Sequence, residues 1–430
     1  MKKILIITYY WPPAGGPGVQ RWLKFTKYLP EFGYETYVYI PENPSYPILD
    51  ETLAKDVNPK VKLIKNKIWE PYQLAEKLNP KNKAYKGGHF EKKENQSLLS
   101  KLSVFVRGNF FIPDARKFWV NPSVAYLKDF LQKENIDTIV TSGPPHSLHL
   151  IGLKLKKQLP NIKWLADFRD PWTQISYHKE LKLTSWAAKK HENLEREVMQ
   201  KADVILATSY ADGENFKKIG AKWVEVITNG FEEVKQQTEK DQKYFHLTYS
   251  GGLEILRNPA SLWKALSEII AENQSFKEDF KLDFYGSLAD DVKQTIIDQG
   301  LENNLIVHGY VSHQESLNAI NAANILLLTN FDNQASKGII PGKLFEYMAT
   351  GNPILAIGPT DADVEKILQK TEAGNYFMPQ QVEEMKGFIL SVYKQWLVNP
   401  NQKFETNKKE VQQFNRKNLT SKLVEVMNRL

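Results

Sequence analysis

The sequence predicts an α/β protein with two doubly wound parallel sheets, one in each half of the chain. Three observations predict this fold class. Strand-like apolar runs alternate with helix-length segments almost from end to end, glycine-rich turns follow several of these runs, and 430 residues exceed the size at which one core usually keeps growing. Because ligands of such sheets bind outside the carboxyl ends of the strands, candidate site residues are sought there.

The apolar runs place the expected strands and the domain boundary. In the first half, strands are expected at 3–9, 35–40, 61–65, 137–142, 163–168, 203–208 and 224–228. In the second half, they are expected at 245–251, 281–286, 305–310, 324–329 and 353–358. A polar run at 227–246 predicts an N-terminal domain over 1–230 and a C-terminal domain over 231–411, both Rossmann-like. We expect a helix at about 412–430 to pack back on the first domain. The polar stretch at 79–96 is expected to form an excursion from the first domain. We also expect a ligand-binding cleft between the domains.

Composition excludes several classes of protein. The chain is 42% hydrophobic and 25% charged, which is ordinary for a globular protein. It has no cysteine, which excludes disulfides and thiolate metal sites. The net charge of +7 is spread over segments that also carry acidic residues, which favours solvated helix faces over a nucleic-acid surface. No apolar stretch is long enough for a membrane span or a signal segment, so we expect a cytoplasmic protein.

A glycine-rich turn follows the first expected strand, in "YYWPPAGGPGVQRW" at 9–22. Gly15, Gly16 and Gly18 would let a ligand approach the backbone at the start of the next helix, where Arg21 would add positive charge. The alternative is a merely tight turn. A dinucleotide fingerprint would need glycine where Arg21 stands, so a nicotinamide enzyme is disfavoured.

Two further loops of the first half carry candidate site residues. His146 follows the strand expected at 137–142 and would open the next helix, where it could bind a sugar or phosphate oxygen or simply cap the helix. Asp167 and Arg169 come at the end of the strand at 163–168, where they could contact hydroxyl groups of a ligand or form an ion cluster that pins the loop.

The second half of the sequence carries the more specific binding motifs. Gly251 and Gly252 follow a strand, and Arg257 comes shortly after, which suits contacts to a phosphate. In "PGKLFEYMATGNPI", Lys343 stands at a helix start, which is favourable for an anion. Glu346 lies one turn further among apolar neighbours, where the hydroxyls of a ribose are natural partners.

These motifs together resemble the retaining glycosyltransferases of family 4, which have the GT-B fold of two facing Rossmann-like domains. The resemblance extends along most of the chain, and "PGKLFEYMATGNPI" is its most specific part. It implies that Glu346 holds the ribose of a nucleotide sugar, that Arg257 and Lys343 neutralise its diphosphate, and that the loop with Val311 forms the wall for the base. It also implies an acceptor on the first half, near the glycine turn and His146.

One position departs from the family pattern. The family has a second glutamate eight residues before the ribose-binding one, and Gly338 occupies that position here. Backbone amides near Ile339 and Ile340 would then take over contacts to the sugar or phosphate. Whether Gly338 alters or abolishes activity is left open by the sequence.

The resemblance implies transfer of a sugar from a nucleotide-sugar donor to a glycan or lipid-linked acceptor, with retention. The expected setting is surface polysaccharide or glycoconjugate biosynthesis, with no metal or other cofactor and with peripheral contact at the inner face of a membrane. A nucleotide-sugar epimerase of the same architecture and a non-catalytic sugar-nucleotide binding protein are the alternatives. The sequence does not specify the sugar, the base, the acceptor or the oligomeric state.

Overall fold

The computed structural model divides into two compact units. Unit 1 comprises Met1–Thr228 and Leu419–Leu430, and unit 2 comprises Asn229–Asn418. The structure describes residues 1–70, 98–175, 178, 181–233 and 243–430. The excursion expected at 79–96 and the middle of the expected boundary segment lie outside these residues.

Unit 1 is built on a seven-stranded parallel sheet with the order β3-β2-β1-β4-β5-β6-β7. This order is that of a doubly wound sheet: strands are added on one side from β1 to β3 and on the other side from β4 to β7, so the strand order reverses between β1 and β4. Each of the seven strands expected in the first half is present. Their bounds are β1 Lys2–Ile7, β2 Tyr34–Pro41, β3 Lys62–Asn66, β4 Thr138–Gly143, β5 Lys163–Phe168, β6 Val204–Ala207 and β7 Val224–Val226.

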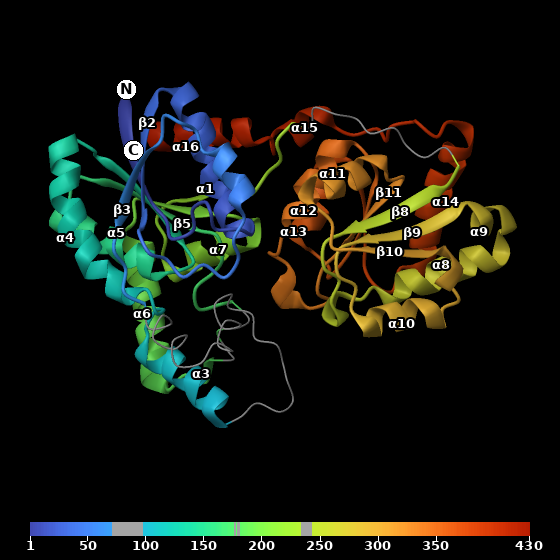
Figure 1. Ribbon diagram of the computed structural model, residues 1–430, viewed down its shortest axis with the longest axis horizontal. Coiled ribbons are helices and arrows are strands. Elements are labelled where there is room, and N and C mark those ends of the chain that lie inside the picture. The colour runs from blue at the N-terminus through green and yellow to red at the C-terminus, as the bar shows by residue number, and fades with distance from the viewer. Residues whose placement is uncertain (71–97, 176–177, 179–180, 234–242) are drawn as a thin grey trace. The chain divides into compact units, whose positions relative to one another are not determined.

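Helices cover both faces of this sheet because its central strands are apolar on both sides. Ile4 and Ile6 face one layer, and Leu5 and Ile7 face the other. The first layer holds α1 and α16, and the second holds α4, α5, α6 and α7 (Figure 1). The helices of unit 1 are α1 Pro17–Tyr28, α3 Leu98–Phe110, α4 Lys117–Glu134, α5 Ser147–Gln158, α6 Ser185–Lys201, α7 Tyr210–Ile219 and α16 Arg416–Asn428.

The C-terminal helix α16 belongs mainly to unit 1, although the chain reaches it through unit 2. Leu423 and Val426 pack in the same apolar layer as Ile4 and Ile6. Asn428 accepts a hydrogen bond from Lys2 Nζ at 2.7 Å. The last helix therefore helps to hold the first strand of the chain in place.

Unit 2 is built on a six-stranded parallel sheet with the order β10-β9-β8-β11-β12-β13. Its strands are β8 Phe245–Ser250, β9 Phe280–Tyr285, β10 Leu305–Gly309, β11 Ile325–Thr329, β12 Ile354–Ile357 and β13 Gly374–Phe377. The strand β13 at the sheet edge is missing from the sequence prediction. It has only four residues and begins with glycine, which is rare in strands.

Helices also cover both faces of the second sheet. Helices α8, α9, α10 and α14 pack on one face, and α11, α12, α13 and α15 pack on the other (Figure 1). Their bounds are α8 Ala260–Glu272, α9 Gln274–Asp279, α10 Asp290–Asp298, α11 His313–Ala322, α12 Gly342–Thr350, α13 Asp363–Thr371, α14 Val382–Val398 and α15 Lys408–Gln412.

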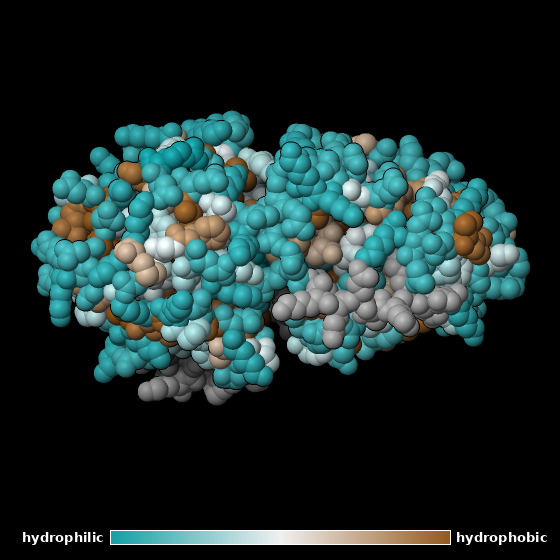
Figure 2. All heavy atoms as spheres, turned by 90° about the horizontal axis from the view of Figure 1, so that it is seen from above, coloured by the Kyte–Doolittle hydropathy of each residue, from teal (hydrophilic) through white to brown (hydrophobic). Residues whose placement is uncertain are grey.

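The surface seen in Figure 2 is mainly hydrophilic, with scattered apolar side chains. Among the described residues, no helix combines the length and the apolar character that crossing a bilayer requires.

Candidate functional site

A sharp turn follows β8 in unit 2 and brings the glycine backbone close to the half-buried side chain of Lys343. Gly251 has a φ of +105°, a conformation that L side chains rarely adopt, and its amide donates to the Tyr285 carbonyl at 2.7 Å. A Cβ atom at Gly251 would lie 3.1 Å from Lys343 Nζ. Glycine at this position therefore lets Lys343 approach the turn closely.

Lys343 lies in the first turn of α12 and carries its charge into a partly apolar environment. Its Nζ donates to the Ser250 carbonyl at 2.6 Å and lies 3.9 Å from the centroid of the Tyr249 ring. Burial, and to a lesser extent the positive charge of Arg257, lower the pKa of Lys343 to about 7. An anion bound beside Lys343 would favour its charged form.

Arg257 brings a second cation to the same turn. It ends the short 3-10 helix Ile255–Arg257, and its Nη2 donates to the Gly252 carbonyl at 3.1 Å. Its Nε is buried and has no hydrogen-bond partner among the described residues. Arg257 therefore brings a second positive charge close to Lys343.

The helix α12 completes this side of the site. It begins after Pro341 without a side-chain cap on its first amides, which is favourable for an anion. The Tyr347 hydroxyl accepts a hydrogen bond from the Ser250 amide at 3.0 Å and so fixes the helix to the end of β8. Glu346 is half-buried one residue earlier, and its negative charge raises the pKa of Lys343.

Three other residues predicted for donor binding lie on loops at the same edge of the sheet. Ile339 and Ile340 directly precede α12, and the Ile339 carbonyl accepts from Asn330 Nδ2 at 2.8 Å. Val311 is half-buried after β10, in the loop that leads into α11. That helix is joined to the Gly251 turn by a 2.6 Å hydrogen bond between the hydroxyls of Ser316 and Ser250.

In unit 1, Arg169 ties together the glycine turn and the loop before His146. Arg169 Nη1 donates to the Gly18 carbonyl at 2.7 Å, and its Nη2 donates to the Pro144 carbonyl. A Cβ atom at Gly18 would lie only 2.6 Å from Arg169 Nη1. The two neighbouring members of the turn, Gly15 and Gly16, precede α1, and Gly16 is the residue that caps this helix.

Arg21 and Asp167 form a buried ion pair, whereas the sequence predicts positive charge from Arg21 beside a ligand and leaves Asp167 open between a ligand contact and an ion cluster. Their side chains are 1% and 0% exposed, and Arg21 Nη2 lies 2.9 Å from Asp167 Oδ1. Trp22 Nε1 and Ser142 Oγ also donate to the Asp167 carboxylate. This pair already satisfies itself within unit 1, so a contact of either residue to a ligand stays a prediction that would require the pair to open.

His146 is placed as the sequence predicts, directly before α5, but its side chain is buried. It stacks on Trp172 with the ring centroids 5.1 Å apart and the planes within 3°. Neither ring nitrogen has a hydrogen-bond partner among the described residues. Burial lowers the pKa of His146 well below its usual value, so the neutral ring offers one donor and one acceptor.

Residues 361–363 match the Asp-x-Asp pattern, which was not considered when no metal was predicted from the sequence. The two carboxylates differ in environment. Asp361 is exposed and forms ion pairs with Lys337 and Lys366, whereas Asp363 is fully buried at the start of α13. Their surroundings therefore do not describe one shared metal site.

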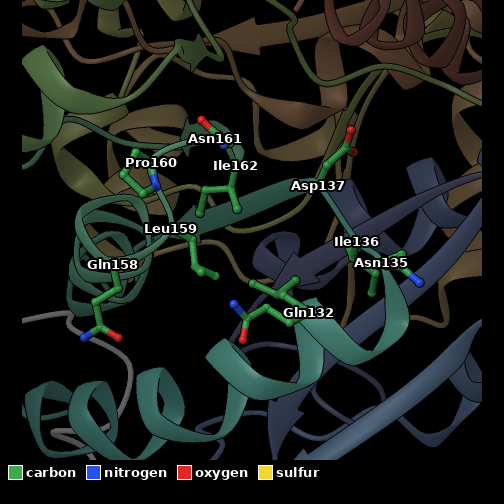
Figure 3. Close-up of a pocket in the computed structure, with 10 residues that line it drawn as sticks. Gln132, Asn135, Ile136, Asp137, Gln158, Leu159, Pro160, Asn161 and Ile162 are labelled. Atoms are coloured by element: carbon green, nitrogen blue, oxygen red, sulfur yellow. The ribbon is translucent and has the colours of Figure 1, made fainter.

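A hollow of about 510 Å³ lies near the N-terminal ends of strands β4 and β5 in unit 1. It is lined by the C-terminal ends of α4 and α5 and by the loops before β4 and β5 (Figure 3). The candidate site residues lie at the opposite ends of these strands, so this hollow is separate from them.

Comparison with known proteins agrees with this architecture. Residues 245–395, less than half of the chain, match the family model described as Glycosyl transferases group 1. The match falls within unit 2 and contains Arg257, Lys343 and Glu346. No curated protein sequence matches the chain.

Solved structures resemble the whole chain. The lipopolysaccharide outer core galactosyltransferase WaaB is 13% identical, with both chains fully covered and a TM-score of 0.59. The chain has the GT-B fold. TarM of S. aureus, in complex with Fondaparinux, alpha-GlcNAc-glycerol and UDP, is 11% identical over 100% of both chains, with a TM-score of 0.55. A putative UDP-N-acetylglucosamine 2-epimerase from Listeria monocytogenes is 11% identical over 99% of this chain and 96% of its own, with a TM-score of 0.52.

Several site residues were not predicted from the sequence. Two of them are tyrosines: the Tyr249 ring lies against the Lys343 ammonium, and Tyr347 holds α12 in place. Both are apolar-looking residues within regular elements, so the sequence pattern indicates only core positions for them. Ser250 could have been noticed, because it is a polar residue directly before a pair of glycines. Trp172 stacks on His146 and follows Pro171 in the chain, and no sequence pattern marks it as a site residue.

Proposed function

We propose that the protein is a glycosyltransferase that takes a sugar from a nucleotide-sugar donor and transfers it with retention to a glycan or lipid-linked acceptor. The observation that carries the proposal is the convergence of Arg257 and Lys343 on the Gly251–Gly252 turn. Glu346 lies on the same helix as Lys343, and all three residues fall in the region that matches Glycosyl transferases group 1. The surface polysaccharide or glycoconjugate setting is part of the same proposal.

In the proposed reaction, the acceptor oxygen attacks the anomeric carbon on the face from which the diphosphate leaves. The acceptor proton passes to the leaving phosphate. Negative charge builds on the diphosphate as the bond breaks, and Arg257, Lys343 and the first turn of α12 would stabilise it. Glu346 would hold the ribose hydroxyls, as the family resemblance implies. Stabilisation of the leaving diphosphate allows the bond between it and the sugar to break. The two cations are proposed to provide this stabilisation without a metal.

The acceptor is proposed to bind unit 1 at the glycine turn and His146. His146 has two unpartnered ring nitrogens and low exposure, so a hydroxyl reaching it would meet a preorganised neutral ring. Arg169 would fix the two loops around it.

A nucleotide-sugar epimerase is the second candidate, because the resemblance to the putative epimerase from Listeria monocytogenes extends over 99% of this chain. A purely nucleotide-binding role is the third, because Gly338 stands where the family has a glutamate. Incubation with a panel of nucleotide sugars separates the three. A transferase releases nucleoside diphosphate faster when an acceptor mixture is added, an epimerase converts the sugar without an acceptor, and a binding protein does neither.

A further inference from the structure

The His146 imidazole is held in place by neighbouring aromatic rings. His146 is 7% exposed, and neither of its ring nitrogens has a hydrogen-bond partner among the described residues. Its most nearly parallel neighbour is the indole of Trp172, with the ring planes 3° apart. A Cβ atom at Gly143 would lie 3.2 Å from His146 Nδ1, so the glycine that ends β4 leaves room for the ring. Aromatic packing therefore determines how this imidazole lies.

The indole of Trp172 is itself anchored on helix α6. Trp172 is 2% exposed, and its Nε1 donates to His191 Nδ1 at 3.0 Å. This hydrogen bond requires the tautomer of His191 that carries its proton on Nε2. Burial, and to a lesser extent the charge of His178, lower the pKa of His191 to about 4. The ring is therefore neutral at pH 7, and its Nδ1 remains an acceptor.

Helix α6 also holds the residue that follows Trp172. Glu195 lies four residues after His191, so both side chains share one face of α6, and both are buried. The Glu195 carboxylate accepts from the Thr173 amide at 3.4 Å and from the Thr173 hydroxyl. Trp172 is thus fixed through its own side chain and through the backbone of the next residue, so α6 sets the place of the indole.

We propose that Trp172 and His191 are positioning residues for His146. The indole keeps the imidazole flat against it, and His191 keeps the indole in place. The proposal rests on the proposed function, in which His146 meets a hydroxyl of the acceptor, and it gives neither Trp172 nor His191 a contact with the substrate. A ring that is already placed needs no reorganisation when the acceptor arrives, so its displacement should slow transfer without weakening donor binding.

Substitutions of the anchor test the proposal. His191→Asn retains an acceptor, because the amide oxygen of asparagine lies about where Nδ1 of histidine lies, whereas His191→Leu is of similar size and has none. We expect His191→Leu to lower kcat for sugar transfer by about tenfold or more, and His191→Asn to recover most of the wild-type rate. Trp172→Phe keeps a flat ring but removes the donor, so it should behave like His191→Leu.

The matched control is Trp186→Phe, because this tryptophan is 64% exposed in the first turn of the same helix. It should transfer sugar at the wild-type rate. In all four variants, KM for the nucleotide sugar is expected to stay within about twofold of the wild-type value, because the proposed donor contacts lie in unit 2.

Nuclear magnetic resonance of labelled histidine rings measures the placement of His146 without any sugar transfer. The chain has eight histidines, and the His146 signal is the one that His146→Gln lacks. The ring current of Trp172 is expected to shift the His146 ring protons upfield in the wild type and in His191→Asn. The shift should be much smaller in His191→Leu and in Trp172→Phe. Trp186→Phe should give the wild-type signal.

These two measurements keep the proposal distinguishable from the proposed function. Absence of transfer by the wild type would contradict the proposed function, and the His146 signal would still decide whether Trp172 and His191 place the ring. A wild-type His146 signal without the upfield shift would overturn the proposal by itself, whether or not a variant folds.

A melting curve first establishes which variants are folded. An unchanged His146 signal in folded His191→Leu and Trp172→Phe would overturn the proposal, as would a wild-type kcat in both. A loss of donor affinity as large as the loss of kcat would overturn it too, because it would show a general disturbance of the structure.

Discussion

At the scale of single residues, Lys343 is the group whose protonation should depend most on a ligand. Its pKa is about 7 in the free protein because of burial and the nearby Arg257, and a bound diphosphate would raise it. Above pH 7 the free ammonium loses its proton, so binding must take one up. We therefore expect nucleoside diphosphate affinity to fall as pH rises above 7, by up to about tenfold per pH unit.

Titration calorimetry in buffers of different ionisation enthalpy measures this proton uptake. At about pH 8 the wild type is expected to take up nearly one proton per bound diphosphate, and Lys343→Gln is expected to take up none. Binding by the wild type without proton uptake would show that the diphosphate does not contact Lys343.

Glu346 allows a second test at this scale. Glu346→Gln keeps the shape of the side chain but removes the charge, so it should weaken nucleoside diphosphate binding by roughly 1 to 3 kcal/mol if the carboxylate accepts from ribose hydroxyls. Glu384→Gln, at an exposed position of α14, is the matched control and should bind as the wild type does. Calorimetry that finds the same affinity in all three proteins would remove Glu346 from the site.

The sequence predicts some of these residues better than others, for a physical reason. Gly251, Arg257 and Lys343 each follow a strand or start a helix, and parallel strands bring such positions to one edge of the sheet. The pairing of Arg21 with Asp167 depends on tertiary contact between residues far apart in the chain, which no local pattern encodes.

At the scale of elements, the glycine turn after β1 depends on Arg169. The Arg169 guanidinium is held by the Gly18 and Pro144 carbonyls, so it cannot move freely away from a new side chain at Gly18. Gly18→Ala should break the bond between Arg169 and the turn, at a cost of roughly 1 to 3 kcal/mol. We expect sugar transfer to slow while nucleoside diphosphate affinity stays near that of the wild type, because the proposed donor contacts lie in unit 2.

The control for this prediction is Gly387→Ala in α14, where an added Cβ would meet nothing within 4 Å. A melting curve first establishes that both variants are folded. Transfer at the same rate in both variants would show that the turn serves only to connect β1 with α1.

The strands show how much of the secondary structure local sequence patterns predict. All twelve strands expected from apolar runs are present, although only the central ones are buried on both sides; β3 and β10, at the sheet edges, are largely exposed. Strand β13 is fixed instead by its pairing with β12, so tertiary context decides its conformation.

At the scale of the whole molecule, buried histidines should make unit 1 sensitive to acid. Burial lowers the pKa of His149 to about 3 and that of His191 to about 4. Both rings gain protons on unfolding between these values and about 6.5, so stability rises with pH in this range, by up to about 1.4 kcal/mol per pH unit for each ring. The wild-type Tm should therefore drop between about pH 7.5 and about pH 5.5.

His149→Gln isolates one contribution to this pH dependence. The variant should lose less Tm than the wild type over the same pH interval, because glutamine does not titrate. His313→Gln, at an exposed position of α11, should retain the wild-type pH dependence. An identical Tm drop in all three proteins would contradict the assignment of acid sensitivity to buried imidazoles.

Unit 2 is proposed to bind the diphosphate of a nucleotide sugar at the Gly251–Gly252 turn. The decisive measurement is calorimetry with the best-binding nucleotide from a panel of UDP, GDP and ADP, and with its monophosphate. We expect Arg257→Gln to weaken diphosphate binding by roughly 1 to 3 kcal/mol and to leave monophosphate binding nearly unchanged. Equal losses for the two ligands, or no loss for either, would contradict it.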